Sequence, residues 1–390
     1  MKACTWNGIN DVRVETVPDP AILAPHDIIL RVGLSAVCGS DLHLIDGFVP
    51  TMKPGDILGH EFMGEVVDVG PEVQTLRPGD RAVVMPCIAC GGCWFCENGL
   101  WSMCDNSNPH PHTAEALYGH ASAGVFGYSH AYGGFAGSHA EYVRVPFADR
   151  GAFKVPEGIA DEQALFVSDA LPTGYMAAEM CNIRAGDIVA VWGCGGVGLM
   201  AIQCAYAMGA ERVIAIDRVP ERLALARDRA CAIPLNFEEC DVVEELLAAT
   251  GGRGPDACID AVGMEADATG PIQWVDKAKQ ATRLESDRPY VLRETIRACR
   301  KGGTVVVIGA YGGAVDKFPI GAVMNKGLTV KSGMQHGHRY AKHLFQLIAR
   351  GDIDPSYLLT HPMKLSAAPE AYRMFKDKTA GMVRAAFRPH

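Results

Sequence analysis

The chain has 390 residues, of which 48% are hydrophobic and 21% charged, so it is long enough for two or three domains and too apolar to be disordered. Its 36 basic and 45 acidic side chains give a formal charge of −9, which excludes the basic surface that nucleic-acid binding requires. The N-terminus has no basic segment followed by an apolar run, and no apolar run reaches the roughly 18 residues of a membrane span. We therefore expect a cytoplasmic protein with no membrane span and no nucleic-acid partner.

Two regions with different patterns follow one another along the chain. Up to about residue 85, short apolar runs separated by Gly, Pro and Asp predict strands joined by turns, at 27–32, 64–69 and 81–84. From residue 188, short β-branched runs alternate with helical periods, which is typical of a parallel sheet covered by helices on both faces. This pattern predicts strands at 188–192, 212–217, 256–262 and 304–308, and helices at 196–208, 220–230, 242–249 and 290–300.

The predicted fold class is α/β, with a doubly wound parallel sheet in one domain. After residue 333 the pattern is mixed again, so we expect one domain of residues 1–168 and 334–390 and a second of residues 169–333. Two segments fit neither pattern: 105–140, which holds five histidines and shows no clear period, and the polar insertion 264–289. Loops this long are usually functional or disordered.

A glycine motif marks a nucleotide site. Gly193, Gly195 and Gly198 form G-x-G-x-x-G between the predicted strand 188–192 and the next helix. The first glycine permits the turn, the second lets the backbone approach a pyrophosphate, and the third lets helix and strand pack closely. We expect the phosphates at the N-terminus of the helix, at Gly196 and Val197, where unpaired N–H groups favour negative charge.

The end of the next predicted strand bears on the choice of nucleotide. Asp217 stands there, and a carboxylate at this place accepts hydrogen bonds from a ribose and repels a 2′-phosphate, which favours NAD over NADP. Arg218 follows it directly and opposes this preference, because an arginine can accommodate the 2′-phosphate.

Cysteines point to a structural metal site. Of 14 cysteines, five lie between residues 87 and 104. Cys90, Cys93, Cys96 and Cys104 have the spacing C-x2-C-x2-C-x7-C, which suits four thiolates around a tetrahedral zinc. Cys87 precedes Cys90 at the same three-residue spacing, so spacing alone does not decide which four bind.

A thiol and an imidazole supply candidate ligands for a catalytic zinc. Cys38 and His60 each follow a turn-like segment. A catalytic zinc needs a third protein ligand and an open fourth position, so these two residues alone are a weak signal.

Taken together, these motifs resemble those of the medium-chain, zinc-dependent alcohol dehydrogenases. Residues 59–66, Gly-His-Glu-Phe-Met-Gly-Glu-Val, look like the zinc signature of that family. Cys38, this signature, the cysteine lobe and the glycine motif occur in the family's order, and the resemblance covers essentially the whole chain. It implies a GroES-like, mostly-β catalytic domain, a Rossmann coenzyme domain, two zinc ions per chain and hydride transfer between an alcohol and NAD.

The resemblance also concerns the third zinc ligand. The family's usual ligand is a Cys six residues before the Tyr of a Thr-Gly-Tyr stretch, and here Asp169 stands at that place, before Thr173-Gly174-Tyr175. This exchange and the insertion at 105–140 resemble the formaldehyde dehydrogenase and dismutase branch. A carboxylate oxygen is an accepted zinc ligand.

Membership of that branch implies roles for further residues. Ser40 would accept the substrate proton, His43 would pass it to solvent, Asp41 would orient the zinc histidine, and Glu61 would lie close to the zinc. The residues expected at the nicotinamide nucleotide are Thr173, Val262, Gly263, Ile308, Gly309 and Arg384, the last at the pyrophosphate.

Three functions stay open on the sequence. The first is a zinc-dependent NAD dehydrogenase of the formaldehyde dehydrogenase type, acting on a small alcohol or aldehyde. The second is an aldehyde dismutase that retains its NAD, with the insertion 105–140 covering the adenine end, although the insertion is equally well explained as a surface loop of an oligomer. The third is a catalytically silent protein with structural zinc only. We also expect a homodimer or homotetramer, for which the sheet edge near 304–330 offers a pairing surface.

Overall fold

The protein divides into two compact units. The structure, a computed structural model, describes residues 1–264, 266, 287–313 and 315–390. One unit comprises Met1–Pro172 and Gln335–His390, and the other Thr173–Met334. The boundaries differ from the expected ones by a few residues, so that Asp169, expected in the second domain, belongs to the first unit. Most of the expected insertion at 264–289 lies outside the described residues.

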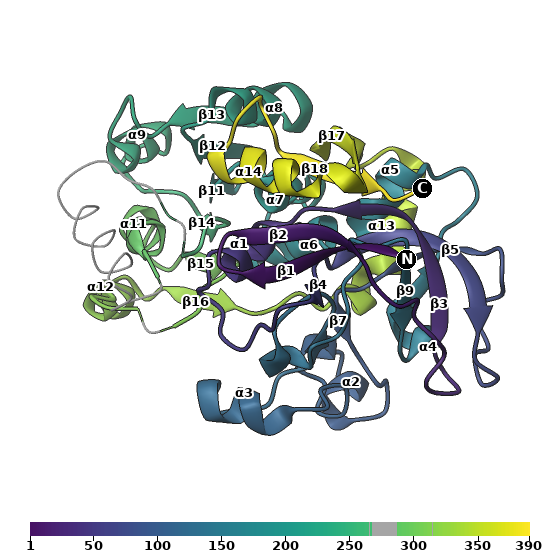
Figure 1. The fold of residues 1–390 in the computed structure, drawn as a ribbon. Helices are drawn as coiled ribbons and strands as arrows, with labels where there is room; N and C mark the ends of the chain where they lie inside the picture. The colour runs from purple at the N-terminus through teal and green to yellow at the C-terminus, as the bar shows by residue number, and fades with distance from the viewer. Residues whose placement is uncertain (265, 267–286, 314) are drawn as a thin grey trace. The chain divides into compact units, whose positions relative to one another are not determined.

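The first unit is built on a seven-stranded, mainly antiparallel sheet with the order β10-β6-β5-β3-β18-β17, in which β9 also pairs with β3 (Figure 1). Its strands are β3 (Ile28–Ala36), β5 (Glu61–Val69), β6 (Arg81–Val84), β9 (Tyr142–Val145), β10 (Ala152–Lys154), β17 (Leu359–Lys364) and β18 (Arg384–Arg388). A three-stranded sheet has the order β2-β1-β4, and a two-stranded sheet pairs β7 with β8. The bounds of these are β1 (Lys2–Gly8), β2 (Asp11–Thr16), β4 (Asp56–Ile57), β7 (Cys87–Ile88) and β8 (Gly124–Val125).

Short helices connect and cover these strands. They are α1 (Gly39–Ile45), α2 (Trp94–Glu97), α3 (Pro111–Tyr118), α4 (Ala148–Gly151), α5 (Asp161–Ala164), α13 (Gly337–Arg350) and α14 (Ala368–Asp377), while α6 (Ala170–Cys181) begins in this unit and continues into the other. Helix α3 corrects the sequence analysis, which found no regular element in the insertion. Ala114 is its one buried residue, so the helix has no apolar stripe from which a period could be read.

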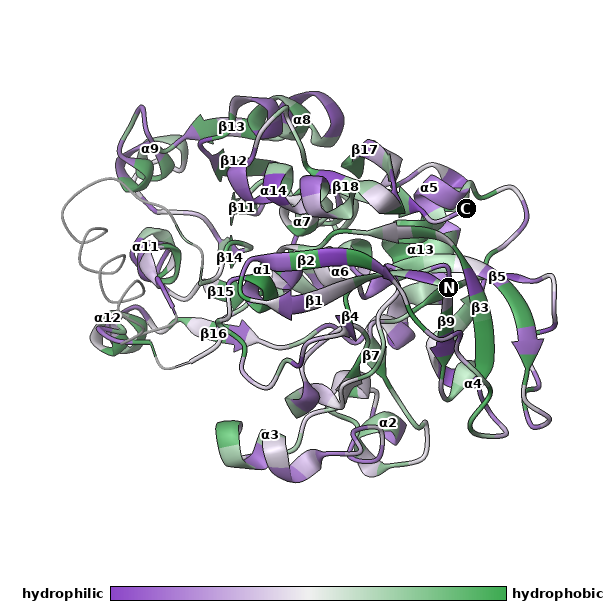
Figure 2. Ribbon diagram, viewed as in Figure 1, coloured by the Kyte–Doolittle hydropathy of each residue, from purple (hydrophilic) through white to green (hydrophobic). Residues whose placement is uncertain are grey.

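The core of the first unit fixes the end of β3. Ile28, Leu30 and Val32 of β3 pack with Phe62 and Val66 of β5, and Figure 2 shows β3 largely in the hydrophobic colour. Two further strands expected from the sequence are β5 and β6, and both lie at or near the expected residues. Strand β3 pairs with β5 on one side and with β18 on the other. These pairings fix the position of Val37 and Cys38, which directly follow the strand.

The second unit is a six-stranded parallel sheet with the order β13-β12-β11-β14-β15-β16. Its strands are β11 (Ile188–Trp192), β12 (Arg212–Asp217), β13 (Ile233–Asn236), β14 (Ala257–Asp260), β15 (Thr304–Val307) and β16 (Thr329–Ser332). Its described helices are α7 (Gly196–Ala207), α8 (Pro220–Ala230), α9 (Val242–Ala249), α11 (Tyr290–Ala298) and α12 (Ile320–Lys326). Helices α9, α11 and α12 lie along one face of the sheet, and α7 and α8 along the other (Figure 1).

This arrangement follows from the strand sequences, which are apolar on both faces. Ile188, Ala190 and Trp192 pack with α9 and α11, and the alternate residues Val189 and Val191 are fully buried as well. The expected strands and helices of this region are present with bounds that differ by two residues or fewer. In the part of the chain that the structure describes, no helix is long and apolar enough to cross a bilayer.

The buried carboxylate of Asp256 binds two segments of the second unit. We expect its contribution to the stability of the fold to depend on pH. Asp256 accepts hydrogen bonds from the N–H of Ile188 at 2.9 Å and from Arg300 Nε at 2.6 Å. Burial alone would raise the pKa of Asp256, but these donors hold it below its usual value. Its contribution to stability is therefore complete above about pH 4 and is lost as the pH falls through the lowered pKa.

We expect Asp256→Asn to lower the free energy of unfolding by about 1 to 2 kcal/mol at pH 7, and by less near pH 3. Urea denaturation at both pH values measures the difference. Asp228→Asn, which breaks an exposed pair with Arg227, is the control and should leave stability unchanged. An equal loss for Asp256→Asn at both pH values would contradict the assignment.

Candidate functional site

Three side chains from separate elements of the first unit meet at one point. Cys38 is the N-cap of α1, His60 directly precedes β5, and Asp169 directly precedes α6. Asp169 Oδ2 lies 3.5 Å from Cys38 Sγ and 3.6 Å from His60 Nε2. A thiolate, an imidazole and a carboxylate around one tetrahedral zinc stand about 3.4 to 3.8 Å apart. The three side chains therefore have the chemistry and the spacing of a zinc site.

The residues around His60 fix the direction of its ring. Asp41 is fully buried, its Oδ2 accepts the N–H of Cys38 at 2.9 Å, and its Oδ1 lies 3.1 Å from His60 Nδ1. Burial alone would raise the pKa of Asp41, but His60 beside it keeps the carboxyl ionised. Ser40 Oγ is 3.1 Å from His60 Nε2, the nitrogen that a metal would take. His43, from the same helix, is buried as well.

Close to Cys38, the side chains of Glu61 and Arg384 form a buried ion pair. Glu61 Oε1 accepts the N–H of Ala170 at 3.0 Å, and its Oε2 lies 3.5 Å from Arg384 Nε. Arg384 Nη2 also lies 3.7 Å from Cys38 Sγ. Burial raises the pKa of Glu61 to about 7, against the opposing charge of Arg384. Arg384 thus contacts one of the candidate metal ligands, and its expected contact with a pyrophosphate stays a prediction.

Two residues that the sequence analysis did not assign lie near this cluster. Cys87, on β7, is buried and lies within electrostatic range of Asp169 and His60. Tyr128 packs against the core cluster that contains Val37, and its ring meets that of Tyr132 edge to face at 5.2 Å. Both residues lie in or near β7 and β8. The spacing of residues in the sequence does not predict that this segment lies beside Cys38, His60 and Asp169.

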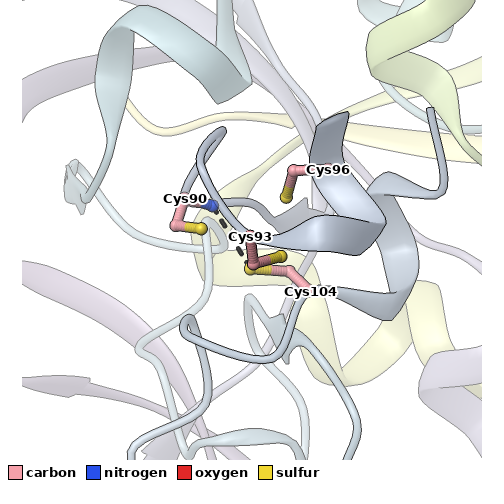
Figure 3. Close-up of side chains that lie close together, drawn as sticks. All are labelled: Cys90, Cys93, Cys96 and Cys104. Carbon is pink, nitrogen blue, oxygen red and sulfur yellow. Dashed lines mark hydrogen bonds between the residues drawn. The ribbon is translucent and has the colours of Figure 1, made fainter. Parts of the chain in front are cut away.

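Four thiols converge in a second cluster (Figure 3). Cys93 Sγ and Cys104 Sγ are 3.9 Å apart, close to the edge of about 3.8 Å expected for thiolates around zinc. The cluster contains Cys90, Cys93, Cys96 and Cys104 and leaves out Cys87, which settles the alternative that spacing left open. Burial opposes ionisation, but the N–H groups of Cys96 and Asp105 lower the pKa of Cys93 to about 7.

The glycine motif of the second unit adopts the conformation that close backbone packing requires. Gly193 has φ of +92°, and a Cβ on Gly198 would lie 1.7 Å from the carbonyl oxygen of Gly193. Gly195 is the N-cap of α7, so that Gly196 and Val197 occupy its first turn, where the N–H groups have no partner within the helix. This loop can cradle a phosphate group.

The acidic residue that follows the glycine motif organises the same loop. Asp217 accepts hydrogen bonds from the N–H of Cys194 at 2.7 Å, of Arg218 at 2.7 Å and of Val219 at 3.0 Å. The Arg218 guanidinium lies 3.3 Å from Glu238. Glu238 therefore already faces the Arg218 guanidinium, the group that would attract a 2′-phosphate.

Asp260 is a residue of this unit that the sequence analysis missed. Its side chain accepts the N–H groups of Val262 and Gly263, at 2.9 and 3.0 Å, and its carbonyl accepts those of Ile308 and Gly309, at 2.9 and 2.8 Å. The expected nucleotide-contacting segments are thus joined through one residue at the end of β14. The available signal was an acidic residue that ends a buried strand, three residues before a Gly.

Two residues at the start of α6 have different surroundings. Thr173 is buried, and a Cβ on Gly174 would lie 2.6 Å from the backbone nitrogen of Ala201. Gly174 therefore allows α6 and α7 to pack closely, and the expected position of Thr173 beside the nicotinamide stays a prediction.

Comparisons with known proteins agree with this geometry. Residues 24–157 match the alcohol dehydrogenase GroES-like domain, and residues 196–278 match the zinc-binding dehydrogenase family. An uncharacterized zinc-type alcohol dehydrogenase-like protein of Bacillus subtilis is 39% identical, over 100% of both chains. A glutathione-independent formaldehyde dehydrogenase of Pseudomonas aeruginosa is 33% identical, over 88% of this chain and 84% of that protein.

A solved structure extends the likeness to the fold. Alcohol dehydrogenase TADH from Thermus sp. ATN1 is 34% identical, with a TM-score of 0.85 over 100% of both chains. The predicted α/β fold class, a GroES-like domain with a Rossmann sheet, is confirmed.

Proposed function

This chain is a member of the medium-chain, zinc-type alcohol dehydrogenase family, and on that premise we propose that it oxidises a small alcohol or hydrated aldehyde with NAD at a zinc held by Cys38, His60 and Asp169. It is an oxidoreductase whose cofactors are zinc and a nicotinamide nucleotide. The observation that carries the proposal is the approach of the three candidate ligand atoms, at 3.5 and 3.6 Å from Asp169 Oδ2.

The proposed mechanism divides the work between the cofactors and the chain. When bound, zinc supplies Lewis acidity that lowers the pKa of a hydroxyl group, and the nicotinamide supplies a hydride acceptor. Ser40, whose hydroxyl lies beside His60 Nε2, receives the substrate proton. His43, one turn further along α1, passes it on. Asp41 holds the His60 ring in one orientation throughout.

Asp169 favours the formaldehyde dehydrogenase type of substrate. A carboxylate replaces the thiolate of the commoner ligand set, and a harder ligand leaves zinc more electrophilic toward an aldehyde hydrate. The Pseudomonas relative, named a glutathione-independent formaldehyde dehydrogenase, agrees with this choice. NAD is the proposed nucleotide because Asp217 stands at the expected ribose position and Glu238 already faces the Arg218 guanidinium at 3.3 Å.

A second copy of the chain is the proposed partner. Strand β16 ends the parallel sheet and is exposed along its length, and α12 has no buried residue. Ile320, Met324 and Val330 are exposed on these two elements. An open strand edge flanked by apolar side chains is suited to pairing across a two-fold axis.

Two measurements on one preparation test these proposals together. Native mass spectrometry of the freshly purified protein should show a homo-oligomer with two zinc ions per chain, and formaldehyde oxidation should require added NAD. One zinc per chain would overturn the catalytic assignment and favour a silent protein with structural zinc only. Tightly retained NAD, with aldehyde dismutation in its absence, would favour the dismutase instead.

A further inference from the structure

His139 lies at the end of the insertion and is fully buried against the residues that orient His60. Its Nε2 is 3.8 Å from Asp41 Oδ2, the oxygen that the Cys38 N–H also reaches. The other carboxylate oxygen faces His60 at 3.1 Å. Asp41 therefore stands between two imidazoles, one of which is a candidate metal ligand.

The backbone holds His139 in register with His60. The N–H groups of Gly137, Ser138 and His139 donate to the carbonyls of Ile57, Gly59 and Leu58, at 2.9 Å each. The approach is so close that a Cβ on Gly59 would lie 2.5 Å from His139 Nδ1. Residues about 80 positions apart in the chain are thereby fixed to one another beside the zinc signature.

The ring of His139 is also fixed in orientation. Its Nδ1 lies 2.7 Å from Ser35 Oγ, which in turn lies 2.7 Å from Ser138 Oγ. Phe387 meets the ring edge to face at 4.9 Å, and the ring of Tyr372 lies 5.9 Å away. The tautomer that suits both polar neighbours accepts from Ser35 at Nδ1 and carries its proton on Nε2, toward Asp41.

We propose that His139 is a positioning residue of the candidate metal centre: its Nε2 lies 3.8 Å from Asp41 Oδ2, beyond hydrogen-bond length, and adds an electrostatic contact to the oxygen that the Cys38 N–H binds, so that the other oxygen stays directed at His60. The proposal rests on the proposed zinc site of Cys38, His60 and Asp169. A buried carboxylate without enough donors is costly and turns toward whatever donor it finds. A residue that contacts a metal-bound histidine commonly contributes about 10- to 100-fold in metal affinity or activity. Asp41 has this place beside His60, and His139 contacts Asp41 in turn.

The test measures metal binding directly, with zinc and cobalt as probes. His139→Phe keeps an aromatic ring but removes the ring N–H, and we expect the zinc affinity of the catalytic site to fall in chelator competition, by less than the roughly 10- to 100-fold that loss of a direct partner of the zinc histidine causes. The d–d absorption of cobalt in that site should shift as well. His139→Gln, whose amide can still donate toward Asp41, should recover most of the affinity, which guards against a loss caused by misfolding alone.

Two comparisons separate positioning from general stability. His338→Phe replaces another buried histidine, which stacks on Trp101 and belongs to neither candidate metal cluster, and it should leave the zinc affinity of the catalytic site unchanged. In the double variant Asp41→Asn/His139→Phe, the loss should match that of Asp41→Asn alone, because both changes act through one carboxylate. Wild-type affinity in His139→Phe, or additive losses, would overturn the proposal. A wild-type protein with one zinc would instead overturn the proposed function.

Discussion

Replacing Asp169 by asparagine should reduce the zinc content from two ions to one per chain and lower kcat/KM at least about 1000-fold. The amide is a much weaker zinc ligand than the carboxylate, so Cys38 and His60 are left with no third anionic or imidazole partner. A loss of this size corresponds to about 4 kcal/mol of transition-state stabilisation, within the range that a metal supplies as a Lewis acid. Elemental analysis and steady-state kinetics on the same preparation measure both quantities.

The control for this change is Asp161→Asn, eight residues earlier in the same unit. Asp161 pairs with Arg81 at the surface and has no place in either metal cluster, so its variant should keep two zinc ions and normal kinetics. Two zinc ions and an unchanged rate in Asp169→Asn would show that Asp169 is not a ligand.

A cysteine at the same position tests whether the carboxylate of Asp169 selects the substrate. Asp169→Cys restores the commoner ligand set of two thiolates and one imidazole, and it should keep the zinc. If Asp169 makes the metal more electrophilic, the rate with formaldehyde should fall in this variant by more than the rate with ethanol. Equal rates for both substrates in the two proteins would remove the argument that the carboxylate selects the substrate.

Sequence patterns were most informative where local chemistry alone decides the structure. The strand Arg212–Asp217 and the helix Pro220–Ala230 lie at the predicted residues, because a β-branched run and a proline in the first helical turn are local signals. The same holds for the glycine motif, where the close approach of Gly198 to Gly193 leaves no room for another residue type.

Contacts between distant parts of the chain could not be predicted in this way. Cys38, His60 and Asp169 were brought together on the sequence only by resemblance, since the last lies more than 100 residues beyond the others. His139 and Asp260 were missed, because each acts through partners that only the folded sheet brings near: Asp41 for the first, and the end of β15 for the second. Helix α3 was missed because an exposed helix has no apolar period.

The choice of nucleotide gives the second large effect. In Asp217→Asn the negative charge beside the expected ribose is lost, and the ratio of kcat/KM for NAD to that for NADP should fall about 100- to 1000-fold. Two changes add up to this result. The ribose loses a charge-assisted hydrogen bond, which commonly contributes about 1.5 to 3 kcal/mol, and the 2′-phosphate no longer meets a like charge, which costs several kcal/mol where it is desolvated.

Glu238 provides the matched comparison, because it faces Arg218 without touching Asp217 in the described contacts. Glu238→Gln alone should improve NADP use modestly, through an Arg218 less occupied by carboxylate, while leaving KM for NAD unchanged. The double variant should exceed either single change for NADP, since the phosphate then gains an attractive partner and loses a repulsive one. Asp217→Asn should also lower thermal stability slightly, because one of the three N–H groups that Asp217 accepts then faces an amide nitrogen. If this loss of stability appeared without any change in the ratio of NAD to NADP, the role of Asp217 would be to hold the glycine loop and not to select the nucleotide.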